Sequence, residues 1–306
     1  MSEQVLVSRA DGVCEVRLNR PEKRNAITFA MYEALRGALL AAEADGDIRA
    51  LLLSGEGAGF CAGNDLHDFL NTNFTSEHPV MGLLRTLATL QKPLLAAVHG
   101  QTVGIGVTML LHCDLIVAAR TTQFSMPFVS LGLVPEAASS LLLPRLIGAQ
   151  RAAELLLLGR SFDADTAHTL GLVNRVVEES ALPAEAHALA VSVARQPPAA
   201  LAATRRLLRG DPGAILARMD EEARIFGAQH RFARHGDDRL LARLLRLIAV
   251  RPGQRIERLL IAIVSILVGP RDPRQHHRVF SLVEFKRIFL VNVNGCEAAG
   301  LAFACV

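Results

Sequence analysis

The sequence lacks tryptophan and has a single tyrosine among its 306 residues, and aromatic residues make up only 5% of it. Proteins that bind single-stranded nucleic acid usually stack the bases on aromatic side chains, so this scarcity argues against such a partner. The formal net charge of +3 is too small to favour nucleic acid on electrostatic grounds. We therefore expect no nucleic-acid partner.

Cysteine is sparse too, and no two cysteines form a C-x-x-C pair. Their odd number and scattered positions argue against a disulfide framework, and the missing pair argues against a structural zinc site, so we expect neither. A reducing, cytoplasmic compartment fits this usage best. The five residues are Cys14, Cys61, Cys113, Cys296 and Cys305.

Long apolar runs are also missing. The longest, residues 259–268, is about half the length that a membrane-spanning helix needs. The first residues do not combine a basic region with an apolar one, and the terminal Ala-Cys-Val is not a peroxisomal address. We expect no secretory signal and no integral membrane segment.

What the sequence does have is apolar content, at 51%, with 21% charged residues. This balance argues against bulk disorder and is ample for one domain of about 200–250 residues plus an appendage. Short, fully apolar segments alternate with helical patterns, which is typical of an α/β fold whose sheet is covered on both faces. We expect strands at residues 4–8, 13–18, 50–53, 94–98, 115–118 and 173–177. We expect helices at residues 28–44, 107–112, 137–146, 150–158, 163–170, 183–195, 198–209 and 212–226.

Two turns of small residues carry the chemical signal. The first is the phrase FCAGNDL at residues 60–66, and the second is Gly104-Ile105-Gly106. Such turns can leave backbone N–H groups pointing at a ligand. Two of them converging in space could hold one developing oxyanion, which is what an enzyme needs to form an enolate from a thioester.

Four phrases resemble the crotonase superfamily, the enoyl-CoA hydratases and isomerases. They are RPEKRNAI (20–27), FCAGNDL (60–66), HGQTVGIGVTMLLHCDLIVA (99–118) and LGLVPEAASSLLLPRLIG (131–148). The resemblance spans roughly residues 4–228 and does not include the Arg-rich tail that follows.

The resemblance implies a crotonase-type spiral of repeated ββα units over residues 1–195 and a helical, trimerisation-type region over 196–250. Residues 251–306 are then an atypical C-terminal extension of unknown role. It also implies an acyl-CoA thioester as substrate, with no metal and no cofactor, since CoA is part of the substrate. Assembly as a homotrimer, or a dimer of trimers, follows if the atypical C-terminus permits it.

By the match, the two oxyanion donors are the N–H groups of Ala62 and Ile105. The residues themselves agree with this assignment. Ala62 precedes a glycine, where the chain can turn and leave its N–H free, and Ile105 lies between Gly104 and Gly106 at the start of a helix.

The catalytic base is where this sequence departs from the hydratases of the superfamily. Those enzymes use two glutamates, and the matching positions here are Thr108 and Phe128. Another carboxylate, Glu136, follows Pro135, in a phrase that resembles the peroxisomal-type Δ3,Δ2-enoyl-CoA isomerase branch. The resemblance implies that Glu136 is the base, and an apolar wall around it would raise its pKa.

The remaining candidates surround the CoA and acyl parts of the substrate. By position in the match, the residues expected to bind CoA are Lys23, Arg24, Asn25, Ala26, Asn64, Asp65 and Leu66. Asp65 could equally cap the short helix that begins near Leu66. The acyl chain is expected to run along Leu66, Phe69, Leu70, Phe128 and Leu133.

The sequence thus predicts an enzyme of acyl-CoA enolate chemistry, in fatty acid metabolism or β-oxidation. The favoured reaction is isomerisation of 3-enoyl-CoA to trans-2-enoyl-CoA by a single glutamate. Two alternatives stay open: a hydratase or other lyase with its acid/base group elsewhere, and a non-catalytic acyl-CoA-binding protein.

Overall fold

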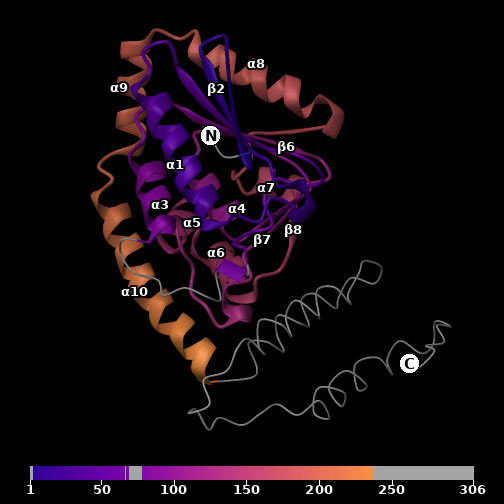
Figure 1. The fold of residues 1–306 in the computed structure, drawn as a ribbon, viewed down its shortest axis with the longest axis vertical. Helices are drawn as coiled ribbons and strands as arrows, with labels where there is room; N and C mark the ends of the chain where they lie inside the picture. The colour runs from indigo at the N-terminus through magenta and orange to yellow at the C-terminus, as the bar shows by residue number, and fades with distance from the viewer. Residues whose placement is uncertain (1–2, 66, 69–77, 237–306) are drawn as a thin grey trace, which may run out of the picture. The chain divides into compact units, whose positions relative to one another are not determined.

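The computed structural model describes residues 3–65, 67–68 and 78–236 (Figure 1). All of these belong to one compact unit, Met1–Ile248. The predicted extension at residues 251–306 lies outside the described residues.

The main sheet is mixed and has six strands in the order β1-β2-β3-β4-β6-β9. β1 and β2 pair antiparallel, and every other neighbouring pair is parallel. The turn between β1 and β2 has positive φ at both Asp11 and Gly12, the geometry that suits a tight hairpin. The strands are β1 (Val5–Ala10), β2 (Val13–Leu18), β3 (Ala50–Gly55), β4 (Leu94–Val98), β6 (Leu115–Ala119) and β9 (Arg175–Val177).

A second, three-stranded sheet has the order β5-β7-β8. Its strands are β5 (Gln101–Val103), β7 (Gln123–Ser125) and β8 (Phe162–Asp163). The sequence did not predict this sheet, because strands of two or three residues are too short to show a period. It matters for the site because β5 leads directly into the second glycine turn.

Local signals mark several helix starts. The Thr28 hydroxyl accepts the Met31 N–H at 3.2 Å, and the Asp163 carboxylate accepts the Thr166 N–H at 2.8 Å. The helices are α1 (Phe29–Ala44), α3 (Pro79–Thr89), α4 (Ile105–Thr108), α5 (Ser139–Ile147), α6 (Ala149–Leu158), α7 (Ala164–Thr169), α8 (Leu182–Ala194), α9 (Pro198–Arg209) and α10 (Gly213–Gly236). Single 3-10 turns are η1 (Pro21–Lys23), η2 (Met109–His112), η3 (Val129–Leu131) and η4 (Glu179–Ala181).

Helices cover both faces of the main sheet, which confirms the predicted α/β class. Figure 1 shows α8 on one side and α1 with α3 on the other. Within β3, Ala50 and Leu52 pack with α8, whereas Leu51 and Leu53 pack with α1 and α3. A strand buried on both faces reads as one continuous apolar run, as this segment does.

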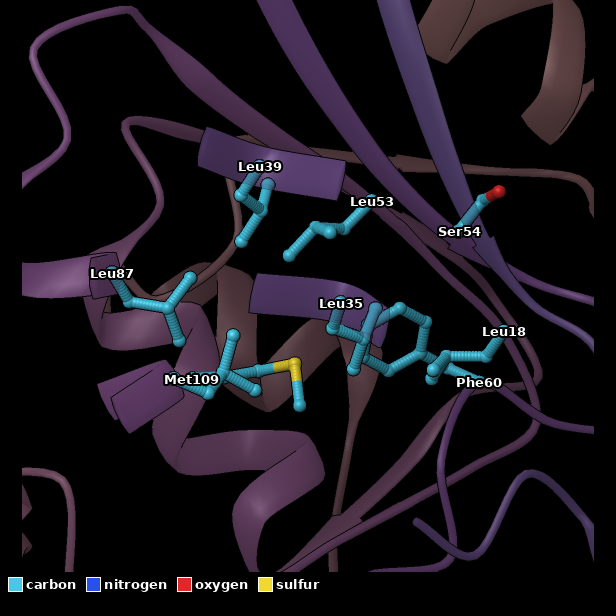
Figure 2. A pocket seen from close by; sticks show the side chains of 9 residues that line it. Leu18, Leu35, Leu39, Leu53, Ser54, Phe60, Leu87 and Met109 are labelled. Atoms are coloured by element: carbon cyan, nitrogen blue, oxygen red, sulfur yellow. The ribbon is translucent and has the colours of Figure 1, made fainter. Parts of the chain in front are cut away.

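The core between α1, α3 and the sheet contains a small cavity of about 10 Å³ (Figure 2). Its lining is apolar apart from Ser54, which Figure 2 shows at its edge. A gap of this size with apolar walls stays dry. It is therefore a feature of core packing and offers no group for chemistry.

Some boundaries differ from the sequence expectation. The helix after the glycine pair begins at Ile105 and divides into α4 and η2. The next helix begins at Ser139, because Ala137 and Ala138 both have positive φ and cannot be helical. The sequence assigned no helix to α3, and α10 runs ten residues past the predicted end at residue 226.

Gly106 is required by a close approach of backbones. A Cβ atom at this position would lie 2.8 Å from the Cys61 carbonyl oxygen and 2.9 Å from the Cys61 Cβ. Gly106→Ala is therefore expected to lower the free energy of unfolding by about 1–3 kcal/mol, because backbone must move to relieve the overlap. Urea unfolding followed by circular dichroism measures this.

Gly37 in α1 is the matched control, since a Cβ there meets nothing within 4 Å. Gly37→Ala is expected to stabilise the protein by about 0.5–1 kcal/mol, as alanine does in a helix interior. Equal stability of the two variants would contradict the close approach.

Candidate active site

The first motif lies between two other segments of the chain. On one side it pairs with β5, where the Val103 N–H donates to the Cys61 carbonyl at 2.8 Å. On the other side the Ile27 N–H donates to the Gly63 carbonyl at 2.8 Å. These pairings bring the two glycine-rich turns together, as the sequence predicted.

The Ala62 N–H is already used within the protein. It donates to the Arg24 carbonyl at 2.9 Å. This contradicts the prediction that Ala62 keeps its N–H free for a ligand. The physical reason is that the segment around Ile27, which pairs with the first motif, also brings the Arg24 carbonyl to the Ala62 N–H. Gly63 does not prevent this approach.

Asn64, two residues later, carries the free N–H. Ile27 bonds to the residues on either side of it, Gly63 and Asp65, so the Asn64 N–H points away from Ile27. Within the described residues this N–H donates to no acceptor. The Asn64 side chain is held by the Tyr32 hydroxyl, which donates to its Oδ1 at 2.6 Å.

The second turn presents Ile105 in the predicted way. Gly104 has φ 55° and ψ −116°, a conformation that favours glycine, and Ile105 is the first residue of α4. A first-turn N–H has no acceptor inside its own helix, and no described group accepts this one. The N–H groups of Ile105 and Asn64 thus both lack an acceptor among the described residues where the turns meet.

Glu136 lies against the same short helix. Its side chain is 8% exposed, and the Thr108 hydroxyl donates to its Oε1 at 3.3 Å. The pKa of Glu136 is raised to about 8: burial is the largest cause, the nearby charge of Glu222 adds to it, and the Thr108 hydrogen bond opposes both. A carboxyl whose pKa lies near neutral pH, in an apolar site, is suited to accept a proton from carbon.

The turn that carries Glu136 is held at several points. His112 Nε2 lies 2.9 Å from the Ala137 carbonyl, and burial lowers the His112 pKa to about 4, so the neutral ring donates here. The Glu222 carboxylate accepts the Ala138 N–H at 2.7 Å and the Ser140 N–H at 3.0 Å. Sequence reasoning assigned neither residue to the site, because nothing local marks the contacts that η2 and α10 make with this distant turn.

A cavity of about 30 Å³ lies beside Glu136, with room for one or two water molecules. Its apolar walls come from α3 (Val80, Met81 and Leu84) and from α10 (Met219, Ala223 and Phe226). Phe128 and Leu133, the predicted acyl-chain wall, are buried in the core and do not line this cavity. Leu66, Phe69 and Leu70 lie outside the described residues.

The predicted CoA-binding residues divide into two groups. Lys23 and Arg24 are exposed, and the Arg24 guanidinium donates to the Gln101 side chain at 2.9 Å. Asn25 is fully buried, and its amide donates to the Glu56 and Gly59 carbonyls, so its side chain is structural rather than substrate-binding.

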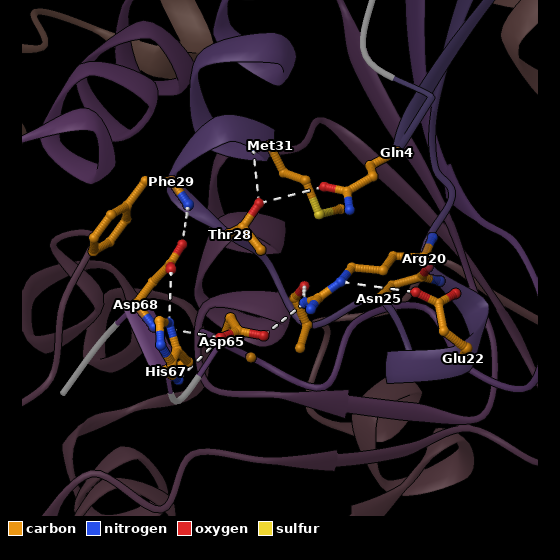
Figure 3. Close-up of polar contacts among 12 residues, drawn as sticks. Gln4, Arg20, Glu22, Asn25, Thr28, Phe29, Met31, Asp65, His67 and Asp68 are labelled. Carbon is orange, nitrogen blue, oxygen red and sulfur yellow. Dashed lines mark hydrogen bonds and ion pairs between the residues drawn. The ribbon is translucent and has the colours of Figure 1, made fainter. Parts of the chain in front are cut away.

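Figure 3 shows how the loop after the first motif is fixed. Asp65 pairs with Arg20 at 2.7 Å and accepts the N–H groups of His67 at 2.9 Å and Asp68 at 3.3 Å, the hydrogen bonds that a capping side chain makes. Asp68 accepts the Phe29 N–H at 2.9 Å. The Ala26 carbonyl accepts a hydrogen bond from the same Arg20 at 2.9 Å.

Ligand atoms of Asp65, His67 and Asp68 lie within 4.8 Å of one another. Both carboxylates are already engaged, by Arg20 and by the N-terminus of α1. The cluster therefore supports a structural role and gives no reason to invoke a cation.

Cys61 adjoins the site but is not suited to be a nucleophile. Burial raises the pKa of its thiol to about 12, and the thiolate is the nucleophilic form.

Comparison with known proteins now gives the class. Residues 8–227 match the family model "Enoyl-CoA hydratase/isomerase". The chain therefore belongs to this family, part of the crotonase superfamily, as its motifs predicted.

Three relatives illustrate the range of the family. The chain is 41% identical over 206 residues, 64% of this chain and 78% of the relative, to a 1,2-epoxyphenylacetyl-CoA isomerase of Escherichia coli. It is 34% identical to the rat enoyl-CoA delta isomerase 2, over 72% of this chain and 58% of the relative. A crystal structure of an enoyl-CoA hydratase/isomerase from Pseudoalteromonas atlantica superimposes with a TM-score of 0.74 at 38% identity, covering 82% of this chain and 99% of that one.

The described helices also bear on the membrane question. None of them combines the length and the hydropathy needed to cross a membrane.

The raised pKa of Glu136 predicts a pH-dependent stability. Ionising this group in the folded state is disfavoured, so the free energy of unfolding falls as pH rises from about 4.5, its ordinary pKa, to about 8. Glu136→Gln, a neutral isostere, should therefore raise the melting temperature by several degrees at pH 9 and leave it nearly unchanged at pH 4.5. Thermal unfolding across this range tests it, and a pH-independent difference would refute the buried, neutral carboxyl.

Proposed function

We propose that the chain isomerises 3-enoyl-CoA thioesters to trans-2-enoyl-CoA thioesters. The observation that carries this proposal is a buried carboxyl, Glu136, hydrogen-bonded to the helix whose first N–H is free. Membership of the enoyl-CoA hydratase/isomerase family supports an acyl-CoA substrate.

The proposed reaction is a proton shift between two carbons. The thioester oxygen accepts hydrogen bonds from the N–H groups of Ile105 and Asn64, with Asn64 in the role that was predicted for Ala62. Glu136 removes a proton from C2, and the resulting dienolate is stabilised by the two donors. The same carboxyl then delivers the proton to C4, so that the double bond moves from C3–C4 to C2–C3.

Both halves of this site have a sound physical basis. Removing one donor from an oxyanion site typically costs about 3–4 kcal/mol of transition-state stabilisation. One base suffices because C2 and C4 can lie on the same face, within reach of one carboxyl group.

Hydration is the less favoured reaction because it needs a group to activate water. At the two positions where hydratases of the superfamily carry glutamates, this chain has Thr108 and Phe128. The Thr108 hydroxyl donates to Glu136, and Phe128 is buried. Neither side chain can exchange a proton as a carboxylate does.

A second candidate substrate comes from the E. coli relative, which is 41% identical and is named for isomerising 1,2-epoxyphenylacetyl-CoA. The same donors and the same base could serve that thioester. Substrate assays separate the two candidates.

The broader setting is likewise a proposal. We propose cytoplasmic β-oxidation as the pathway and a homotrimer, or a dimer of trimers, as the assembly. Light scattering on the full-length chain tests the assembly.

Loss of the base should abolish turnover. With trans-3-hexenoyl-CoA, Glu136→Gln is expected to lower kcat by about 100- to 10,000-fold, the range for a general base. Glu33→Gln, an exposed position on α1, is the control and should keep full activity. Activity of the Glu136 variant within tenfold of wild type would rule out this assignment.

Parallel assays with crotonyl-CoA and 1,2-epoxyphenylacetyl-CoA identify the reaction. Faster turnover of either one would replace the proposed substrate. Tight binding of CoA esters without turnover of any of the three would identify a non-catalytic protein.

The base should also show itself in the pH profile. Because only ionised Glu136 accepts a proton, kcat/KM is expected to rise with pH and level off above about 8. A profile that is flat from pH 6 to 9 would contradict a raised pKa at the catalytic base.

A further inference from the structure

A second buried carboxyl, Glu222 on α10, lies behind the proposed base. It is 5% exposed and lines the same cavity as Glu136. Its carboxylate accepts three hydrogen bonds, from the N–H groups of Ala138 and Ser140 and from the Ser140 hydroxyl at 2.5 Å. The Ala138 donor belongs to the turn that carries Glu136, and the two Ser140 donors belong to the first turn of α5 directly after it.

That turn has an unusual backbone. Ala137 and Ala138 have φ of 58° and 56°, a left-handed conformation that alanine rarely adopts and that two successive residues adopt more rarely still. Such a conformation persists only where the surroundings enforce it. Here His112 holds the Ala137 carbonyl from one side and Glu222 holds the Ala138 N–H from the other.

Three polar groups near Glu136 carry no charge at neutral pH. From α4 comes the Thr108 hydroxyl, from α1 the Tyr32 hydroxyl and from the first motif the Cys61 thiol. These groups are uncharged at neutral pH, since burial raises the pKa of Tyr32 well above its ordinary value and that of Cys61 to about 12.

Glu222 is the other carboxyl that lines the cavity. Burial is the largest influence and leaves its pKa raised, although three donors and the neighbouring Arg218 stabilise its charged form, whereas Glu136 accepts a single hydrogen bond. The other cavity walls are apolar, so the two carboxyl groups interact through a medium of low polarity.

From this geometry we propose that Glu222 is a positioning residue, which clamps the turn from Glu136 to Ser140 and confronts the base with a second negative charge. The inference rests on the proposed role of Glu136 as base. It makes the docking of α10 against α5 and α3 part of the active site. Figure 1 shows α10 alongside α3.

The test is a double-variant cycle on the full-length chain with Glu136→Gln, Glu222→Gln and the combined variant. Its first measurement is thermal unfolding at pH 5 and pH 9, which needs no substrate. With the second charge gone, the gain in melting temperature from Glu136→Gln at pH 9 should shrink by about half, because the two carboxyls no longer repel each other. An unchanged gain would overturn the proposal whether or not the isomerase activity is correct.

The second measurement is the pH profile of kcat/KM. Glu222→Gln removes a like charge, which lowers the pKa of the base, so the rise of kcat/KM should move down by about one pH unit. Measured above pH 9, the kcat of Glu222→Gln should be about tenfold lower than that of wild type, because the turn is less well held. Its KM should stay within about threefold of the wild-type value. A residue that only stabilises the fold would leave the position of the pH rise unchanged.

Two adjacent serines keep the test decisive if Glu222→Gln does not fold. Ser140→Ala removes the hydroxyl that donates to Glu222 and should lower kcat about threefold with little change in KM. Ser139→Ala is the matched control, since the Ser139 hydroxyl is buried with no hydrogen-bond partner among the described residues. Equal kcat for the two serine variants would overturn the clamp. If wild type turns over and Glu136→Gln does not, the proposed function stands irrespective of these outcomes.

Discussion

Everything at this site depends on keeping one ionisable carboxyl out of water. Glu136 is buried where its only hydrogen bond from the described residues comes from the Thr108 hydroxyl. A carboxyl in such surroundings holds its proton to a higher pH and accepts one from carbon more readily. The same burial opposes folding at alkaline pH, so the property that suits the group to chemistry also makes it a local weakness in stability.

The fold supports this carboxyl by bringing three distant segments together. The first motif is paired on both sides, and Gly106 allows α4 to approach it closely. As a result the free N–H groups of Asn64 and Ile105 lie near the helix that contacts the base. Helices α3 and α10 complete the apolar wall. The helical region after the sheet therefore contributes to the site and does more than extend the domain.

How much the sequence predicted depended on how local each signal was. The strands predicted at 4–8 and 13–18 and the helices predicted at 28–44 and 163–170 are present, and each depends on contacts between neighbouring residues: the Asp11-Gly12 turn and the Thr28 and Asp163 caps. The strands of the second sheet were too short to show a period. The helix predicted from Ala137 begins at Ser139 instead, because contacts from Glu222 and His112, distant in the chain, favour a left-handed turn there.

The sequence by itself determined the family, the α/β class, the two glycine turns and Glu136 as the candidate base, because each is written in residue types at fixed spacing. Only the tertiary structure decided which backbone N–H groups are free. Ala62 and Asn64 flank the same glycine and look equivalent in the sequence, but the Arg24 carbonyl accepts the N–H of the first and leaves that of the second exposed. Whether a main-chain donor is available depends on what pairs with it across space, and residue identity does not encode that.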